Sequence, residues 1–247
     1  MVTQPELTIV IPAKNEVHTL PRLLISLSRQ DYPLLPHTRV YVADAGSTDG
    51  TVDVAALFAD QLRISVIAGG LPAVGRNRGA HLATTPYVLF IDADIELNDD
   101  TLLRRSMDTM TRRKLHCLTT SIRCTGGAVP DHLLFAGNNL AQRLASWALP
   151  FATGMFMLFE RAKFNELGGF DERALYAEDY LLSRQVSPRR FGIVSGHVLT
   201  SNRRFRKMGR LKIARMFLNT ALHTFDRTYF LRDQNYWTEV DSGTRPN

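Results

Sequence analysis

The sequence predicts an α/β fold in which helices flank a doubly wound, mostly parallel central sheet, with a helical extension at the C-terminus. Short apolar runs rich in β-branched residues alternate with stretches in which apolar residues recur at helical spacing. Polar residues, several of them acidic, directly follow these apolar runs. With 247 residues the chain can bury a sizeable core, and we expect one domain with the extension attached.

The first half of the chain predicts four strands, over residues 7–12, 39–43, 64–68 and 87–91. Pro12 stops the first strand, and leucines at helical spacing then predict a helix that ends near Gln30. A second helix runs through Phe58, and a third opens at Arg76 and reaches about Ala83. The fourth strand is apolar throughout, which is typical of a strand buried on both faces of a parallel sheet.

The second half of the chain is less regular. An apolar run over 191–194 predicts a strand, and residues 147–159 are interpreted as a helix followed by a core strand, or as a surface that contacts a membrane. Residues 211–225 predict an amphipathic helix that packs on the domain or lies on an anionic membrane. We predict no ordered structure beyond Glu239.

The composition is that of an ordinary globular protein, with 45% apolar and 22% charged residues. The two cysteines, Cys117 and Cys124, match no zinc or redox spacing, so we expect reduced thiols. We recognise no secretory signal and predict a cytoplasmic protein, with the inner face of the membrane as a second location. The net charge of +6 is unevenly placed. Basic residues crowd one segment and favour anionic partners: Arg203, Arg204, Arg206, Lys207, Arg210, Lys212 and Arg215.

Two carboxylates, Asp92 and Asp94, directly follow the strand at 87–91. The carboxyl ends of parallel strands meet at one edge of a sheet, so Asp44, after the second strand, is expected nearby. Oxygen ligands at such an edge suit a divalent cation that also holds substrate phosphates. The alternative is that Asp92 and Asp94 begin a turn or cap the helix near Thr101. The spacing by itself does not decide between the two.

Several short motifs follow one another along the chain. Those in the first half are Ile11-Pro12-Ala13-Lys14-Asn15-Glu16, Asp44-Ala45-Gly46-Ser47-Thr48-Asp49-Gly50-Thr51, Arg76-Asn77-x-Gly79 and Asp92-Ala93-Asp94. Those in the second half are Gly168-Gly169-Phe170-Asp171-Glu172 and Ala177-Glu178-Asp179. The order and spacing of these motifs resemble the GT-A glycosyltransferases, specifically the inverting family 2. The resemblance covers about residues 7–204, and the stretch at 200–205 is similar to a subgroup of small, free-standing bacterial members.

The resemblance implies a GT-A, Rossmann-like domain over residues 1–205. Its nucleotide-binding half would cover about 7–98 and its acceptor half about 99–205, and a basic helical extension and tail would fill 206–247. It also implies transfer of a sugar from a nucleotide-diphosphate sugar to an acceptor hydroxyl with inversion, assisted by Mn2+ or Mg2+. The Gln-x-x-Arg-Trp signature of processive synthases is absent from the sequence, so a single, non-processive transfer is expected.

The same resemblance assigns roles to residues of the nucleotide-binding half. Asp44 would hydrogen-bond the base, and Asp92 would reach the ribose or the metal. Asp94 would ligate the metal. Ala45 stands where many members carry a second acidic residue, which leaves the base preference open. The residues expected to contact the nucleotide sugar are Pro12, Ala13, Glu16, Asp44, Arg76, Asp92, Ala93 and Asp94.

The acceptor half carries the position that matches the catalytic base, Asp179. An acidic residue at the start of a helical pattern is also an ordinary N-terminal cap, and both roles can coexist on one carboxylate. The other candidates are Glu178, Thr153 and Gly154 on the acceptor side, Arg203 and Arg204 as a lid over the phosphates, and His197 as a further metal ligand.

Two alternatives belong to other functional classes. A nucleotidyltransferase can share a similar sheet and acidic pair, but the turn after its first strand carries a glycine-rich phosphate loop that residues 13–16 match poorly. A non-catalytic nucleotide-sugar-binding protein would not need Asp94 and Asp179 intact. The expected partners are the donor sugar nucleotide and a small-molecule or lipid-linked acceptor. We expect no nucleic acid, and the basic C-terminal helix offers a peripheral membrane contact.

Overall fold

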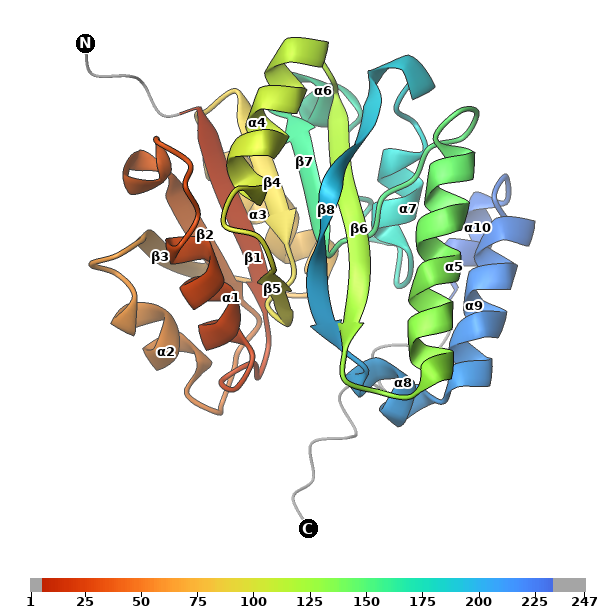
Figure 1. Cartoon of the computed structure of the whole chain (residues 1–247), viewed down its shortest axis with the longest axis horizontal. Helices are drawn as coiled ribbons and strands as arrows, with labels where there is room; N and C mark the ends of the chain where they lie inside the picture. The colour runs from red at the N-terminus through yellow and green to blue at the C-terminus, as the bar shows by residue number, and fades with distance from the viewer. Residues whose placement is uncertain (1–5, 233–247) are drawn as a thin grey trace.

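The first half of the sheet consists of four parallel strands. In the computed structural model, which describes residues 6–232, these are β1 (Leu7–Ala13), β2 (Arg39–Asp44), β3 (Arg63–Ala68) and β4 (Tyr87–Ile91), in the order β3-β2-β1-β4. Each pair is parallel, with Ala13 opposite Asp44 and Asp44 opposite Ala68. The four strands lie where the sequence predicts them, and their carboxyl ends share one edge (Figure 1).

The second half of the chain extends the same sheet with antiparallel pairs. Strand β7 (Phe156–Glu160) runs antiparallel to β4 and to β6 (Cys117–Thr125). Strand β8 (Phe191–Ser201) is parallel to β6, and the short β5 (Ile95–Leu97) closes the edge antiparallel to β8. The full order is β3-β2-β1-β4-β7-β6-β8-β5. The predicted parallel, doubly wound arrangement is therefore found in the first half, and mixed pairing follows it.

Helices cover both faces of the sheet because successive side chains of a strand point to opposite faces. In β1, Leu7, Ile9 and Ile11 belong to one hydrophobic cluster, and Val10 belongs to the other. The first cluster includes side chains from α1 (Leu20–Ser28), α2 (Thr51–Leu57), α4 (Leu102–Arg113), α5 (Val129–Ala145), α8 (Arg203–Met208) and α9 (Arg210–Leu222). The second includes α3 (Pro72–Leu82), α6 (Arg161–Glu166) and α7 (Glu178–Ser183), and α10 (Arg227–Phe230) follows α9.

Helix α3 begins at Pro72, four residues before the predicted start at Arg76. Proline is favoured at the first helical position because its missing N–H would have no partner there and its backbone angle is already helical. Arg76 therefore lies inside the helix, one turn from its start. Gly79 brings α3 against β1, because a Cβ at this position would overlap the side chain of Val10. This contact fixes the distance between the helix and the sheet.

Three further predictions for the second half of the chain can be compared with the structure. The predicted helix within 147–159 is wrong, since α5 ends at Ala145 and Trp147 lies outside it, whereas the core strand is β7. The predicted helix at 211–225 is α9, and its Ile213 is buried in the same cluster as the sheet. Cys117 and Cys124 are free and buried, as predicted. The region beyond Glu239 lies outside the described residues, and within 6–232 we find no helix that could cross a bilayer.

Candidate active site

Acidic side chains gather at the carboxyl edge of the parallel strands. Asp44 ends β2, Asp92 and Asp94 follow β4, and Glu16 lies just beyond β1. Burial raises the pKa of Asp94, and the negative charges of Asp92 and Glu16 raise it further, while nearby arginines act in the opposite direction. The topology thus brings together the carboxylates that the sequence predicts at this edge. We call Glu16, Asp92 and Asp94 the acidic rim.

Arg76 joins the acidic rim to the acceptor half. Its Nη2 lies 2.6 Å from Asp92 Oδ1, and its Nη1 lies 2.6 Å from Glu178 Oε1. The side chain is only 3% exposed, and its guanidinium lies over the ring of Phe170. Burial would lower the pKa of Arg76, but Asp92, Glu178 and Asp179 outweigh it and raise the pKa. Arg76 is therefore a permanently charged bridge between Asp92, which is 16 positions away in the sequence, and Glu178, which is 102 positions away.

Asp179 lies at the start of α7, and two backbone N–H groups hold its carboxylate in place. Gly154 N donates to Asp179 Oδ2 at 2.6 Å, and Tyr180 N donates to Asp179 Oδ1 at 2.7 Å. Burial raises the pKa of Asp179 to about 6, with a second contribution from the negative charge of Glu178. A carboxylate with a pKa in this range can accept a proton near neutral pH and release it again. The structure therefore puts an oriented carboxylate with a raised pKa beside Arg76.

Gly154 makes room for the Arg76 bridge as well as binding Asp179. A Cβ at this position would overlap the Arg76 guanidinium and would also be 3.4 Å from Nη1. Its neighbour Thr153 lies beside the same cluster, and within the described residues no group pairs with the Thr153 hydroxyl, which is buried. The two residues that the sequence predicts on the acceptor side are thus close to the predicted base.

The turns after β1 and β2 are hydrogen-bonded to each other. Asn15 N donates to Ser47 Oγ at 2.9 Å, and Thr48 N donates to Asn15 Oδ1 at 2.9 Å. Glu16 N donates to Thr51 Oγ1 at 2.8 Å. Asn15 has a positive φ of 54°, which asparagine tolerates better than most residues. These bonds fix the position of Glu16 in the acidic rim, and the sequence analysis missed them.

Asp44 is oriented by its own turn. Its Oδ2 accepts hydrogen bonds from Gly46 N and Ser47 N, both at 3.0 Å. Its Oδ1 is buried and accepts no hydrogen bond from any of the described residues. Buried carboxylate oxygens are normally paired, so this atom is suited to a donor that arrives with a ligand. Pro12 and Ala13 end the neighbouring strand β1 in register with Ala43 and Asp44.

Arg203 covers the acidic rim from the start of α8. Its guanidinium forms a two-pronged ion pair with both carboxylate oxygens of Glu16, and its Nη2 lies 3.3 Å from Asp94 Oδ2. The side chain is 39% exposed, in contrast to the buried Arg76. The neighbouring Arg204 also acts on Asp94, because its positive charge lowers the pKa of that carboxyl. Both predicted lid residues therefore lie near the rim.

The acidic rim fits a divalent cation that takes most of its ligands from a substrate. Within residues 6–232, no three histidine, cysteine, aspartate or glutamate side chains form a preassembled metal cluster. Magnesium is often held by one or two carboxylates together with substrate phosphates and water. Burial and, after it, the negative charges of Asp92 and Glu16 raise the pKa of Asp94, and a cation beside this carboxyl would favour its ionised form. Asp94 and Asp92 supply oxygen donors of the kind that such an ion requires.

His197 does not join the acidic rim. The register pairs Ile95 with Thr200 and Leu97 with Val198, so His197 lies beyond the end of β5 that is distant from Asp94. Burial and the charge of Arg123 lower the pKa of His197, and the group that raises it is Asp99. The short strand β5 separates Asp94 from this histidine. With three residues, β5 is too short to show a periodic pattern in the sequence. The structure thus gives no support for His197 as a ligand of the same metal.

A contact that the sequence did not predict joins the motif at residues 76–79 to the motif at residues 168–172. Asn77, next to Arg76 on α3, donates to Phe170 O and to Glu172 Oε1, both at 2.9 Å, and accepts from Phe170 N. A Cβ at Gly169 would lie 2.8 Å from Asn77 Oδ1, so this loop needs its glycine. Neighbouring residues of one helix, Arg76 and Asn77, therefore both bind the acceptor half.

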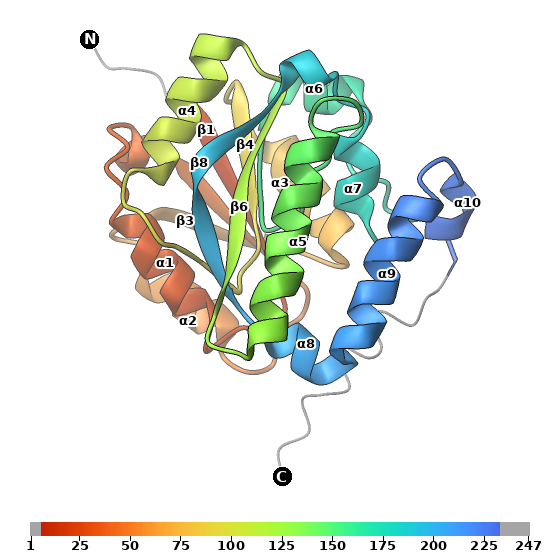
Figure 2. The ribbon, with the colours of Figure 1, turned by 45° about the vertical axis from the view of Figure 1, so that its right-hand side comes forward.

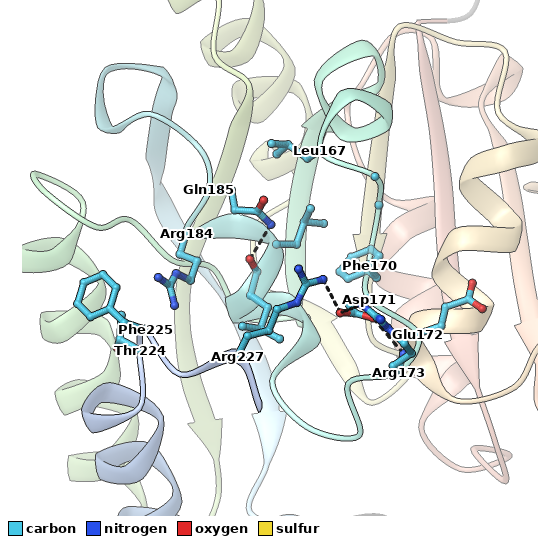
Figure 3. A pocket seen from close by; sticks show the side chains of 14 residues that line it. Leu167, Phe170, Asp171, Glu172, Arg173, Arg184, Gln185, Thr224, Phe225 and Arg227 are labelled. Carbon is cyan, nitrogen blue, oxygen red and sulfur yellow. Dashed lines mark hydrogen bonds and ion pairs between the residues drawn. The ribbon is translucent and has the colours of Figure 1, made fainter. Parts of the chain in front are cut away.

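A separate pocket of about 590 Å³ lies between the 167–173 loop, α7 and the chain after α9 (Figure 3). Arg173 and Arg227 both bind Asp171 at its edge, and Arg184 lies over the ring of Phe225. None of the acidic rim residues lines this pocket, nor does Asp179. It is therefore distinct from the candidate active site, although α7 borders both.

The sheet has a parallel half with an acidic edge, and Arg76 joins this edge to the second half of the chain. This arrangement is that of a transferase of the GT-A class. The chain belongs to glycosyl transferase family 2, whose family model matches residues 8–168. It is therefore a glycosyltransferase, and this membership removes the basis for the nucleotidyltransferase alternative.

Named relatives are consistent with this family. A PGL/p-HBAD biosynthesis glycosyltransferase of Mycobacterium bovis is 29% identical over 231 residues, which cover 76% of this chain and 87% of the relative. The validoxylamine A glucosyltransferase of Streptomyces hygroscopicus subsp. jinggangensis is 40% identical over 95 residues, which are 37% of this chain. The matched part is only 22% of that second, longer relative.

Solved structures share the fold. The mannosyltransferase PcManGT from Pyrobaculum calidifontis, in complex with GDP-Man and Mn2+, has a TM-score of 0.65 and 19% identity and covers 98% of this chain and 75% of that one. S. aureus TarS 1-349 in complex with UDP-GlcNAc has a TM-score of 0.63 and 21% identity. That match covers 79% of this chain and 58% of the TarS chain.

Proposed function

We propose that this glycosyltransferase moves one sugar from a nucleotide-diphosphate sugar to an acceptor hydroxyl with inversion at the anomeric carbon. A divalent cation, Mn2+ or Mg2+, assists the transfer. Two proteins of similar fold have been solved with sugar nucleotides, UDP-GlcNAc and GDP-Man, and the second also holds Mn2+. These complexes support the donor class for this chain, whereas the particular nucleotide and sugar stay open.

The observation that carries the proposal is the Arg76 bridge. One guanidinium binds Asp92 of the acidic rim and Glu178, which directly precedes the predicted base. The buried guanidinium of Arg76 thus links the proposed donor side to the proposed acceptor side, with N–O distances of 2.6 Å to Asp92 and to Glu178. Transfer requires that an acceptor oxygen and a donor sugar be held in line, and a rigid link between the two sides favours this geometry.

In the proposed reaction, Asp179 accepts the proton of the acceptor hydroxyl as that oxygen bonds to the anomeric carbon. The bond from the anomeric carbon to the phosphate oxygen breaks on the opposite face, and the nucleoside diphosphate leaves with the electron pair. The two N–H groups that bind Asp179 orient its carboxylate, and burial, with the negative charge of Glu178 as a second cause, raises its pKa to about 6. Thr153, with its unpaired hydroxyl among the described residues, is placed to bind the acceptor.

The acidic rim and Arg203 would handle the diphosphate. Asp94, together with Asp92, would hold the cation, which supplies positive charge to the departing phosphates. Arg203 now binds Glu16 and Asp94, and it can exchange these carboxylates for phosphate oxygens at little cost because its side chain is partly exposed. Arg204 would add to the same positive charge. Asp44 would use its unpaired Oδ1 to accept a hydrogen bond from the nucleobase.

The test separates the base from the rest of the site. The donor is first identified as the UDP- or GDP-sugar that raises the melting temperature most with Mn2+, and release of nucleoside diphosphate is then measured. Asp179→Asn should reduce this rate by roughly a hundredfold or more, with donor binding unchanged. The wild-type rate should rise with pH through about 6 as Asp179 loses its proton, and this limb should vanish in the variant.

Asp108→Asn, an exposed position on α4, serves as the matched control and should behave as the wild type. A wild-type rate in Asp179→Asn, or a rate that is independent of pH around 6 in the wild type, would assign the base to another residue.

A further inference from the structure

Helix α5 presents an apolar side to the outside of the molecule. Two of its buried positions, Asp131 and Gln142, are polar, and Phe135 is the large apolar residue buried between them. Most helices on a sheet have the opposite arrangement, as α1 does with its buried leucines. The large exposed side chains on or just beyond α5 are apolar and recur at helical spacing: Val129, Leu133, Leu140, Leu144 and Trp147, exposed by 58–87%.

Helix α9 adds a second apolar stripe beside the first. Figure 2 shows α5 and α9 side by side on one side of the molecule. Arg210 at the start of α9 binds Asp131 of α5 with an Nε–Oδ1 distance of 2.5 Å, and Phe135 packs against Phe205 of α8. The exposed apolar side chains of this second stripe are Leu211, Phe217, Leu218, Leu222 and Phe225, exposed by 44–82%.

We call the two stripes together the α5–α9 face. Single exposed apolar residues are normal on a soluble protein, but a contiguous apolar patch marks a surface that is covered in use. The ion pair between Arg210 of α9 and the buried Asp131 joins α9 to α5, and Phe135 of α5 packs on Phe205 of α8, which directly precedes α9. The face is therefore preformed.

The exposed charged side chains within residues 129–147 and 210–225 are basic. Residues 132–159 and 203–225 contain no aspartate or glutamate. Asp131, the acidic residue of α5, is fully buried and bound by Arg210 and Asn202. Basic side chains, by contrast, flank the stripes, including the exposed Arg143 on α5 and Arg215 on α9. A second copy of the chain would bring these like charges together, whereas an anionic surface would attract them.

A cavity of about 550 Å³ lies beside the α5 stripe, between this helix and β6. Its lining includes the basic side chains of Arg123, His132 and Arg143 and one stripe residue, Leu140. Basic groups next to apolar side chains match the two layers of a lipid surface, in which phosphates lie above acyl chains. Trp147, which is 87% exposed, is of the type enriched at this boundary.

We propose that the α5–α9 face docks on an anionic lipid bilayer, with both helix axes in the plane of the membrane. The apolar stripes enter the boundary between head groups and acyl chains, and the flanking arginines bind lipid phosphates. This proposal concerns where the enzyme works and does not depend on which donor it uses or on the role of Asp179. It selects the membrane interpretation of residues 211–225 and adds α5, which the sequence did not indicate.

The first experiment is flotation of the full chain with vesicles. One set contains phosphatidylcholine alone, and the other contains equal parts of phosphatidylcholine and phosphatidylglycerol. We expect binding to the second set, weaker binding as salt is raised, and little binding to the first, because charge attracts the face and apolar burial holds it. Failure to bind anionic vesicles at low salt would overturn the proposal.

The second experiment compares Leu144→Asp on the face with Leu57→Asp, a matched change at a position on α2 that is 78% exposed. Leu144→Asp should weaken vesicle binding by about tenfold or more, because an aspartate replaces a side chain that enters the membrane. Leu57→Asp should bind as the wild type. Arg143→Glu should weaken binding to anionic vesicles through its charge.

Two outcomes would contradict the proposal even if binding is seen. Equal vesicle binding by Leu144→Asp and Leu57→Asp would place the contact elsewhere. A wild-type chain that sediments as a dimer, becomes monomeric with Leu144→Asp and does not bind vesicles would show that a second copy covers the face. Donor binding, measured in the same preparations, should be unchanged in every variant, and this distinguishes a failure here from a failure of the proposed reaction.

Discussion

Two arginines bind the carboxylates of the candidate site, and their surroundings differ. Arg76 comes from the second turn of α3, is 3% exposed and binds carboxylates on both sides of the site. Arg203 begins α8, is 39% exposed and binds the acidic rim from one side. The first is surrounded by protein, with Phe170 against its guanidinium and Gly154 next to it, whereas solvent reaches the second.

The difference separates a structural cation from an exchangeable one. Removing one partner from a buried ion pair leaves uncompensated charge in a poorly solvated place, so Arg76 has no alternative arrangement. Arg203 can leave Glu16 and Asp94 because water and incoming phosphate oxygens can replace them. We expect the region around Arg76 to stay fixed during the reaction and the region around Arg203 to change partners.

The largest expected effect is that of Arg76→Met. The variant leaves the buried Glu178 and the partly buried Asp92 without their cation, and the free energy of unfolding should fall by about 3–5 kcal/mol. Urea denaturation measures this change. Arg104→Met, which removes the exposed pair with Asp31, is the control and should cost no more than about 1 kcal/mol. Equal stability of Arg76→Met and the wild type would show that the bridge is not structural.

Gly154→Ala should have an intermediate effect. The new Cβ would push the Arg76 guanidinium away from its partners and disturb the N–H group that binds Asp179, so the variant should lose about 1–3 kcal/mol of stability. The rate of nucleotide release should fall by more than donor binding does. Gly137→Ala, in an exposed part of α5 with open space around it, should be neutral or stabilising. A fully active Gly154→Ala would mean that the crowding around Arg76 can relax.

The smallest effect on stability is expected for Arg203→Met. Because the ion pairs of Arg203 are partly exposed, the free energy of unfolding should change by no more than about 1 kcal/mol. Donor binding, measured by titration calorimetry with Mn2+, should weaken by about tenfold, since a charge-assisted bond to phosphate is lost. Arg206→Met, on the same helix, is the control. Unchanged donor binding in Arg203→Met would remove this arginine from the proposed lid.

Local patterns predicted the first half of the fold well. An uninterrupted apolar run placed β4 at residues 87–91, and the acidic residues that follow it lie at the predicted edge. The start of α3 was missed, although Pro72 is the signal that marks it. Strand β5 has only three residues, which is too short for a periodic pattern. The family resemblance suggested His197 as a further metal ligand, and the register of β5 with β8 puts this histidine beyond the end of β5 that is distant from Asp94.

Tertiary contacts account for what the sequence could not predict. Nothing in the neighbourhood of Arg76 indicates that it pairs with Glu178, which is 102 positions away. The sequence placed Arg76 along the nucleotide, and that role stays a prediction beside the ion pairs that the structure shows. The outward apolar side of α5 was also missed, because helical spacing gives the sides of a helix but not which side faces the sheet. The assignment of Asp179 as the base awaits its experiment.

The hydrogen bonds between the turns after β1 and β2 have a consequence for engineering. The backbone N–H groups of Asn15, Glu16 and Thr48 each donate to a side-chain oxygen of the opposite turn. If residues 14–17 were replaced by those of a homologue without residues 46–51, these N–H groups would lose their acceptors and the carboxylate of Glu16 would be displaced. The two segments therefore form one cassette, and an altered preference for the nucleobase should be sought by exchanging both together.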